Sequence, residues 1–167
     1  MRTLFTTGGG TGHFHPLVPI ARAMAGTGHE VAFATLAYNA PQVEASGFRC
    51  FRARDSSEEE REAVLLELRG LSPAARREFL VRRGFPVLAA QRMLPDLLAL
   101  HAEWPPDLVV SDNCEFAGRV AAESWNIPHA TVKSGNNYRY NERHALVPAM
   151  DALRIMAGLP PDPDAAM

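Results

Sequence analysis

Cysteine, lysine and long apolar runs are scarce or missing in this sequence of 167 residues. Cys50 and Cys114 lie far apart without Cys-x-x-Cys or Cys/His spacing, so nothing indicates a disulfide scaffold or a structural zinc site. We expect two free thiols in a reducing cytoplasm, with a disulfide as the alternative. No apolar run approaches the roughly 20 residues of a membrane span. Because Arg2 is followed directly by a short apolar run and glycines, no secretory leader is expected either. We therefore expect a cytoplasmic protein with no membrane partner.

The charge of the chain is nearly balanced. The 17 basic and 19 acidic side chains leave a formal net charge of −2, which gives no reason to expect nucleic acid or an anionic membrane surface as a partner. All the basic residues except Lys133 are arginines, which we attribute to a bias of the coding genome. Apolar residues make up 47% and charged residues 22% of the chain, and its length suits one domain with a proper core.

The stretch TTGGGTGHFHP, residues 6–16, organises the rest of the chain. It follows a short apolar run and precedes an amphipathic one, which predicts a strand, a glycine-rich turn and a helix. In an open α/β sheet such a turn places ligand-contacting atoms at the carboxyl edge of a strand. His13 and His15 are expected at the mouth of this turn, and His13 is the stronger candidate for a functional residue.

The other segments alternate in the manner of a doubly wound sheet. Since crossovers between parallel strands are right-handed, the pattern predicts an α/β fold with strand order 3-2-1-4-5. We expect a Rossmann-like parallel sheet with helices on both faces in residues 1–157, and a proline-rich linker or tail in residues 158–167. The expected strands are 2–7, 29–35, 48–53, 107–112 and 127–132, and the expected helices outside the insertion described next are 14–25, 41–45, 115–125 and 143–157.

Residues 55–100 form a helical insertion after the third strand in this interpretation. They contain no strand-like run and carry the charge clusters SSEEE, ARRE and VRR, which indicate solvated helix faces more than a binding patch. Ser57 and Glu60 have the spacing of a capping box, which predicts a helix to about Arg69. Two further helices are expected over 72–83 and 87–100. An insertion on a sheet scaffold is a common place for a substrate pocket.

The predicted topology brings His13 and Asp112 together. The first and fourth strands are neighbours at the switch point of a 3-2-1-4-5 sheet, and these two residues follow their carboxyl ends. A carboxylate bonded to one imidazole nitrogen fixes the tautomer, so the other nitrogen can take a substrate proton. The alternative is a structural, hydrogen-bonded histidine.

Two nucleotide motifs and a metal site are weakly supported. Both registers of G-x-G-x-x-G place a histidine, His13 or His15, where the third glycine belongs, and no acidic residue ends the second strand. No Gly-Lys-Ser/Thr follows the glycines, so the loop is not a P-loop. His13, His15 and Asp112 would supply three metal ligands, but supporting partners cannot be named, and we expect no metal. The remaining histidines are single and scattered.

Three sequence blocks carry a family resemblance. GTGHFHPLVPIA, GTGHEVAFAT and DLVVSDNCEFAGRVAAESWNIPHATV, in this order, resemble the amino-terminal half of a GT-B glycosyltransferase. The similarity is greatest to bacterial enzymes that glycosylate macrolides, enediynes and aromatic polyketides, which are related to the UDP-glycosyltransferases. The alternative within the superfamily is a peptidoglycan N-acetylglucosaminyl transferase. The resemblance is weakest over 55–100.

The resemblance implies roles for individual residues. His13 would deprotonate a hydroxyl of a small-molecule aglycone and Asp112 would orient His13, and the sugar would transfer with inversion from a nucleotide-activated donor without metal or other cofactor. The residues expected to contact the acceptor are Gly10, Thr11, Gly12, Phe14, Phe79, Phe85, Ser134 and Asn136.

The same resemblance implies a second, donor-binding domain, for which these 167 residues contain no motif. We expect the chain to be a fragment that holds the acceptor and the base, has negligible transferase activity alone, and has a carboxy-terminal donor-binding domain as its partner. A non-catalytic Rossmann-like auxiliary module, with the glycine loop as a turn or anion cradle, is the alternative from another class. A small-molecule reductase is disfavoured, because the dinucleotide-binding fingerprint G-x-G-x-x-G is missing. Association of two copies as a homodimer is left open by the sequence.

Overall fold

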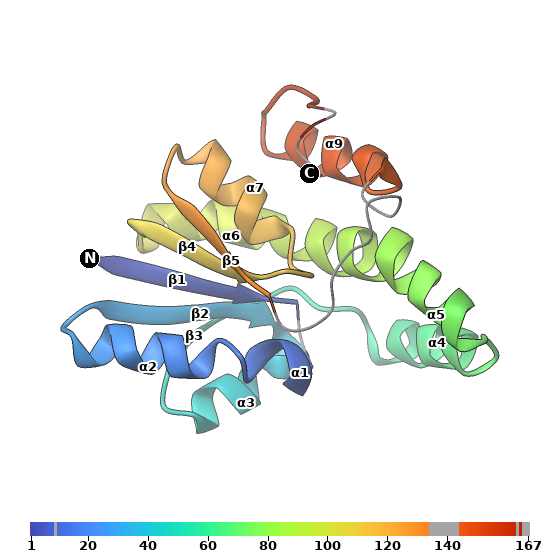
Figure 1. Cartoon of the computed structure of the whole chain (residues 1–167), viewed down its shortest axis with the longest axis horizontal. Coiled ribbons are helices and arrows are strands. Elements are labelled where there is room, and N and C mark those ends of the chain that lie inside the picture. Colours follow the sequence, from blue (N-terminus) through green and yellow to red (C-terminus); the bar gives the residue numbers. More distant parts are fainter. Residues whose placement is uncertain (9, 134–143, 163, 165–167) are drawn as a thin grey trace.

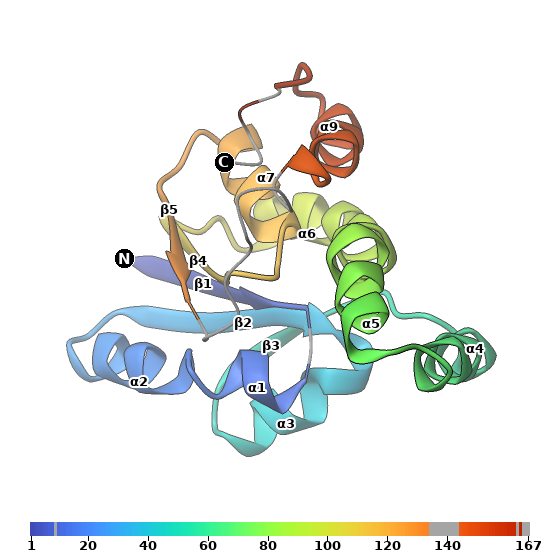
Figure 2. The same cartoon turned by 45° about the vertical axis from the view of Figure 1, so that its right-hand side comes forward.

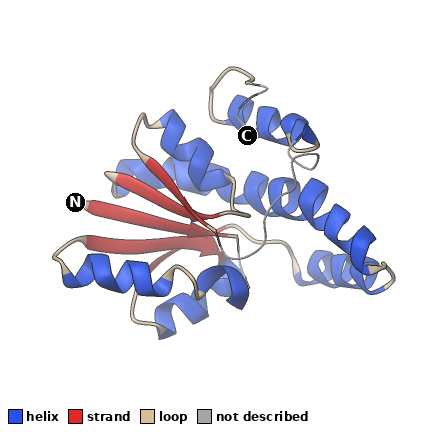
Figure 3. Ribbon diagram, in the orientation of Figure 1, coloured by secondary structure: helices blue, strands red, loops and turns tan. Residues whose placement is uncertain are grey.

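The fold is described from a computed structural model, for residues 1–8, 10–133, 144–162 and 164 of the chain. At its centre is a parallel sheet of five strands in the order β3-β2-β1-β4-β5, shown in red in Figure 3. The predicted fold class and strand order are both confirmed. The strands are β1 (Arg2–Thr7), β2 (Glu30–Leu36), β3 (Arg49–Ala53), β4 (Leu108–Asp112) and β5 (His129–Val132).

Helices cover both faces of the sheet, in three layers (Figures 1 and 2). One face carries α1 (Thr11–Phe14), α2 (Val18–Gly26) and α3 (Ala40–Ala45), which follows the short 3-10 helix η1 (Ala37–Asn39). The other carries α6 (Gln91–Glu103) and α7 (Ala117–Ser124), and α9 (Val147–Met156) packs against them from outside. Successive side chains of a strand point to opposite faces. Accordingly Leu4 joins the core under α6 and α7, whereas Phe5 joins the core under α1 and α2.

The helix expected over 14–25 is divided in the structure. A single turn, α1, ends at Phe14, and α2 begins only at Val18 with Pro19 in its first turn. The Leu17 amide still donates to the Phe14 carbonyl at 3.0 Å, so tight turns connect the two helices. The division matters because α1 is a separate turn and carries His13. The other elements outside the insertion lie within a few residues of their expected positions, and residue 143, at the expected start of the last helix, lies outside the described residues.

The insertion begins as predicted. In α4 (Glu58–Arg69), Ser57 Oγ accepts from the Glu60 backbone N–H at 3.1 Å and the Glu60 carboxylate accepts from the Ser57 N–H at 2.9 Å, which is the expected capping box. Ser72 caps α5 (Pro73–Phe79). The arm formed by α4 and α5 projects past the carboxyl ends of the strands (Figures 1 and 2).

The prediction of a break between the second and third insertion helices is wrong. From α5 the chain continues through a π-helical segment, η2 (Leu80–Ala90), directly into α6. Gly84 and Pro86 lie at the expected break, and proline removes an i→i−4 hydrogen bond and crowds the preceding turn with its ring. The wider π turn accommodates Pro86 inside the helix. Within the described residues, no helix combines the length and apolar character that crossing a membrane requires.

Candidate active site

The glycine-rich loop places His13 at the carboxyl edge of the sheet. Gly10, directly before α1, has a φ of 88° and a ψ of 143°. This is a conformation that residues with a Cβ rarely adopt. The His13 and Phe14 amides then donate to the Gly10 carbonyl, both at 3.1 Å, and close the turn. A Cβ at this position would have room, since the nearest atom would be His13 Cδ2 at 3.8 Å. The loop therefore needs glycine here for its backbone conformation and not for lack of space.

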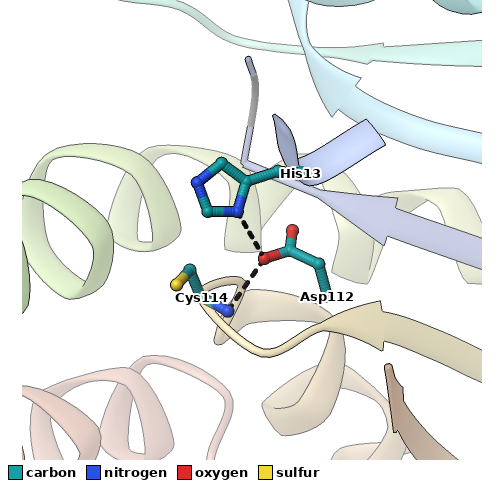
Figure 4. A group of neighbouring side chains, drawn as sticks. All are labelled: His13, Asp112 and Cys114. Carbon is teal, nitrogen blue, oxygen red and sulfur yellow. Dashed lines mark hydrogen bonds and ion pairs between the residues drawn. The ribbon is translucent and has the colours of Figure 1, made fainter. Parts of the chain in front are cut away.

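Asp112, the last residue of β4, lies opposite His13 (Figure 4). Its Oδ1 is 3.0 Å from His13 Nδ1 and also accepts from the Cys114 backbone N–H at 2.8 Å. The aspartate side chain is 1% exposed and that of His13 23%. Asp112 Oδ2 is buried and has no hydrogen-bond partner within the described part of the chain. The sequence prediction that these two distant residues meet is thus confirmed in geometry.

The Asp112 carboxylate controls the charge of His13. Its hydrogen bond to the imidazole raises the pKa of His13 to about 10, the Cys114 side chain contributes in the same direction, and burial opposes the shift. Figure 4 shows the second ring nitrogen of His13 directed away from Asp112. The arrangement therefore holds the imidazole by one nitrogen and leaves the other available to a ligand.

Only some of the residues expected to contact an acceptor lie beside this pair. The Phe85 ring, from η2, meets the His13 ring edge-on with centroids 5.4 Å apart. The Phe79 ring contacts the Arg83 guanidinium, 5.4 Å from its centroid. Gly10, Thr11 and Gly12 are exposed on the loop and α1, and the expected contacts Ser134 and Asn136 lie outside the described residues.

The expectation for Phe14 is wrong in this structure. Its side chain is 0% exposed and packs edge-on against Phe33, with ring centroids 5.3 Å apart, in the core beneath α2. Since α1 is a single turn, consecutive residues on it point in different directions, and exposing His13 turns Phe14 into the core. Phe14 therefore supports the loop from below and has no surface to offer a ligand.

The His13-x-His15 metal hypothesis also fails in geometry. His15 Nε2 lies 2.9 Å from Gln42 Nε2, the amide at the start of α3, so the two histidines have different neighbours. The third potential ligand beside His13 and Asp112 is Cys114 and not His15. The ligand atoms of His13, Asp112 and Cys114 lie within 4.8 Å of one another. The sequence contained no signal for this cysteine, which has no motif spacing to His13.

A second polar cluster, missed by sequence reasoning, lies buried beside the pair. We call Thr6, Ser111, Glu115 and His129 the buried network. Thr6 Oγ1 lies 2.7 Å from Ser111 Oγ and donates to Glu115 Oε2 at 2.5 Å, and His129 Nε2 is 3.0 Å from Ser111 Oγ. Polar residues inside the buried strands β1 and β4 were the available signal, since Thr6 and Ser111 are register partners.

The buried network is closed by the first turn of α7. Glu115 Oε1 accepts from the Ala117 N–H at 2.5 Å and Oε2 from the Gly118 N–H at 2.8 Å. Burial raises the pKa of Glu115 to about 7, and burial lowers the pKa of His129 to about 4. A Cβ at Gly118 would lie 2.2 Å from Thr6 Oγ1. The part of the network around Thr6, Ser111 and Glu115 is therefore tightly packed against α7.

Comparison with known proteins identifies relatives of the chain. It is 32% identical over 163 residues to 4'-demethylrebeccamycin synthase of Lentzea aerocolonigenes, covering 96% of this chain and 37% of that protein. It is 34% identical over 130 residues to L-demethylnoviosyl transferase of Streptomyces niveus, covering 77% of this chain and 33% of the relative. The chain thus spans about a third of the length of these relatives.

Solved structures share the fold. The glycosyltransferase VinC, in complex with dTDP, superimposes with a TM-score of 0.76 at 23% identity, over 100% of this chain and 47% of that one. SsfS6 from Streptomyces sp. SF2575 gives 0.77 at 24% identity, over 98% of this chain and 48% of that one. The fold is therefore that of the amino-terminal half of a GT-B glycosyltransferase.

The family assignment rests on most of the chain. Residues 22–151 match the family described as "Erythromycin biosynthesis protein CIII-like, N-terminal domain". The matched segment runs from α2 into α9 and includes Asp112 and Cys114. The chain belongs to the family of erythromycin biosynthesis protein CIII-like N-terminal domains, from glycosyltransferases of natural-product biosynthesis.

Proposed function

We propose that this chain is the acceptor-binding half of an inverting glycosyltransferase, in which His13 is the general base and Asp112 orients it. The observation that carries the proposal is the 3.0 Å contact between His13 Nδ1 and the buried Asp112 Oδ1 at the carboxyl edge of the sheet. Ligands of open α/β sheets bind at this edge, next to the point where the strand order reverses. The natural-product glycosyltransferases among the relatives supply the reaction class.

The proposed step moves one proton and one glycosyl group. An acceptor hydroxyl donates its proton to His13 Nε2 while its oxygen attacks the anomeric carbon of a nucleotide-activated sugar. The bond from that carbon to the nucleotide's terminal phosphate breaks, and the nucleoside diphosphate leaves with the bonding electron pair. Asp112 keeps Nδ1 protonated and stabilises the imidazolium that forms.

The raised pKa of His13 sets a condition on this mechanism. An imidazole accepts a proton only in its neutral form, and with a pKa of about 10 most of the His13 population is protonated at pH 7. The rate of transfer should therefore increase with pH through the neutral and mildly alkaline range. The hydrogen bond to Asp112 makes the His13 imidazole a stronger base, but it also lowers the fraction of His13 that is neutral and able to accept a proton at pH 7.

The binding part of the proposal is tested on the chain itself. Calorimetric titration with hydroxylated aromatic and macrolide aglycones, and separately with nucleotide sugars, should detect an aglycone and no tight nucleotide sugar. We also expect negligible turnover from the chain alone. Tight binding of nucleotide sugars, or turnover without a partner, would contradict the assignment to the acceptor half.

The catalytic part needs the chain joined to a donor-binding domain. His13→Ala should lower kcat by about 10²–10⁴-fold, the usual contribution of a general base, with acceptor affinity retained. His15→Ala is the matched control, because that ring lies against Gln42 and should leave kcat nearly unchanged. Equal kcat values for the two variants would favour a non-catalytic binding module.

A further inference from the structure

His13, Asp112 and Cys114 form a donor set that the proposed reaction does not use as a whole. They come from α1, the end of β4 and the turn before α7, and Figure 4 shows them as neighbours around the Asp112 carboxylate. Each offers one ligand atom, and the three atoms lie within 4.8 Å of one another. Imidazole, carboxylate and thiolate are the three side-chain types that bind Zn²⁺ in proteins.

The geometry of the set is near that of a tetrahedral site. Bond lengths of about 2.0–2.3 Å to zinc imply ligand atoms roughly 3.3–3.8 Å apart. The separation of 3.0 Å between His13 Nδ1 and Asp112 Oδ1 is slightly short of that range, and the 4.8 Å limit of the set exceeds it by about one ångström. Small rotations of the Cys114 side chain and the His13 ring would close this difference.

A second observation at the site also favours a cation. Asp112 is 1% exposed, yet its Oδ2 has no hydrogen-bond partner among the residues that the structure describes. A buried carboxylate oxygen without a donor is costly, and a cation that coordinates Oδ2 would remove that cost. His13 is 23% exposed, which gives an ion a route from solvent.

We propose that His13, Asp112 and Cys114 bind a thiophilic divalent cation, with Zn²⁺ as the prototype, and that this ion inhibits the enzyme reversibly. Binding uses the Asp112 carboxylate and the His13 imidazole, so the inhibitory consequence rests on the proposed function, whereas the binding itself does not. Mg²⁺ and Ca²⁺ prefer oxygen ligands and are not expected here.

Protons must leave when the ion enters. The Cys114 thiol loses its proton to become a thiolate, and the protonated His13 ring loses one proton to free a nitrogen lone pair, so up to two protons are released for each ion. The two negative ligands then neutralise the charge of the cation. Affinity should consequently rise with pH.

Cobalt titration of the chain tests the binding directly. Co²⁺ coordinated by a thiolate has a near-ultraviolet charge-transfer band, and tetrahedral Co²⁺ has visible d–d bands. We expect both to saturate near one equivalent, and Zn²⁺ to displace the cobalt. Cys114→Ser should lose the charge-transfer band and weaken Zn²⁺ binding about tenfold or more, as measured against a chromophoric chelator.

Cys50→Ser is the matched control. Cys50 lies in β3, outside the set, and burial raises the pKa of its thiol to about 11. Its replacement should leave both spectra and affinity as in the wild type, while thermal unfolding checks that each variant is folded. Absence of a thiolate band in the folded wild type, or equal Zn²⁺ affinity in Cys114→Ser and Cys50→Ser, would overturn the site.

The inhibitory consequence is measured separately, in the chain joined to its donor-binding domain. With each variant's rate normalised to its own zinc-free rate, Cys114→Ser should need at least about ten times more Zn²⁺ for half-inhibition than Cys50→Ser. Cobalt binding without inhibition would overturn inhibition by this ion and leave the metal site standing. If His13→Ala retains turnover, the proposed base is wrong and the cobalt result still decides the site.

Discussion

Two polar clusters lie side by side at the carboxyl ends of β1 and β4, and they differ in how their carboxylates are satisfied. In the buried network both Glu115 oxygens accept hydrogen bonds, from Thr6 and from the first turn of α7. In the His13–Asp112 pair, Asp112 Oδ1 has two hydrogen-bond partners, whereas Oδ2 has none in the described part of the chain. Glu115 is buried, with 5% of its surface exposed, whereas the His13 side chain is 23% exposed.

This difference fits a structural role for the buried network and the proposed chemical role for the His13–Asp112 pair. A buried polar group that only supports the fold is stable when every donor and acceptor is matched. A group that binds or reacts with a ligand needs a hydrogen-bond donor or acceptor that the protein itself leaves unpaired. Burial sets the pKa of Glu115, while a specific partner sets that of His13, in the raised direction for both.

Of the substitutions predicted here, Gly118→Ala should lower the free energy of unfolding most, because its new Cβ would clash with the buried network. The new Cβ would lie 2.2 Å from Thr6 Oγ1 and 2.7 Å from Glu115 Oε2, so the helix or the network must shift. We expect a loss of about 3 kcal/mol or more in the free energy of unfolding, measured by urea denaturation. Gly12→Ala is the control, since nothing lies within 4 Å of its Cβ position, and a similar loss there would contradict the packing argument.

Glu115→Gln should have the next largest effect and depends on pH. The folded pKa of about 7 is above the ordinary value of 4.5, so the stability that protonated Glu115 contributes is full below about pH 4.5 and is lost as pH rises through 7. The Gln amide cannot accept at both positions, which should cost about 1–3 kcal/mol at pH 5.

The gap between Glu115→Gln and the wild type should narrow at pH 8, where ionised Glu115 has lost its advantage. The exposed Glu62→Gln is the control, for which we expect little change at either pH. A gap of the same size at pH 5 and pH 8 would argue against a raised pKa for Glu115.

Asp112→Asn tests the His13–Asp112 pair by removing the carboxylate that raises the pKa of His13. The folded pKa of about 10 exceeds the ordinary value of 6.5, so the stability from this pair is complete below about pH 6.5 and is lost as pH rises through 10. Denaturation at pH 6, 8 and 10 should show this decline in the wild type and a flatter profile in Asp112→Asn. Parallel profiles would mean that Asp112 does not hold the imidazolium.

Ser57→Ala should have the smallest effect and lies outside both clusters. It removes the side chain that accepts from the Glu60 N–H at the start of α4, on the projecting arm. A cost of about 0.5–1 kcal/mol is expected from loss of an exposed cap, with the His13 titration measured by NMR unchanged. A shift of that titration would show that the arm is coupled to the site.

The sequence predicted the sheet and the meeting of His13 with Asp112 because both follow from order along the chain. Each strand is an apolar run beside a turn, and parallel strands in a 3-2-1-4-5 sheet bring their carboxyl ends to one edge. The capping box of Ser57 and Glu60 was equally local.

Features that depend on packing were not predictable in the same way. Gly84 and Pro86 lie at the expected break and their local preferences oppose an α-helix, and the π turn that accommodates them has no simple sequence pattern. Phe14 was assigned to the acceptor from the family resemblance, and one turn of helix has no periodicity from which the direction of its side chain could be inferred. The Glu115 contact with Thr6 and the position of Cys114 depend on how β1, β4 and the turn before α7 are arranged in space.

The pH dependence of kcat/KM, measured for the chain joined to a donor-binding domain, tests the role of the His13–Asp112 pair most directly. For the wild type we predict a rate that climbs with pH towards about 10, the pKa of the paired His13. In Asp112→Asn the plateau should be lower and the limb should move to lower pH, because the carboxylate no longer holds the imidazolium. An acid limb at the same pH in both proteins would contradict a base controlled by Asp112.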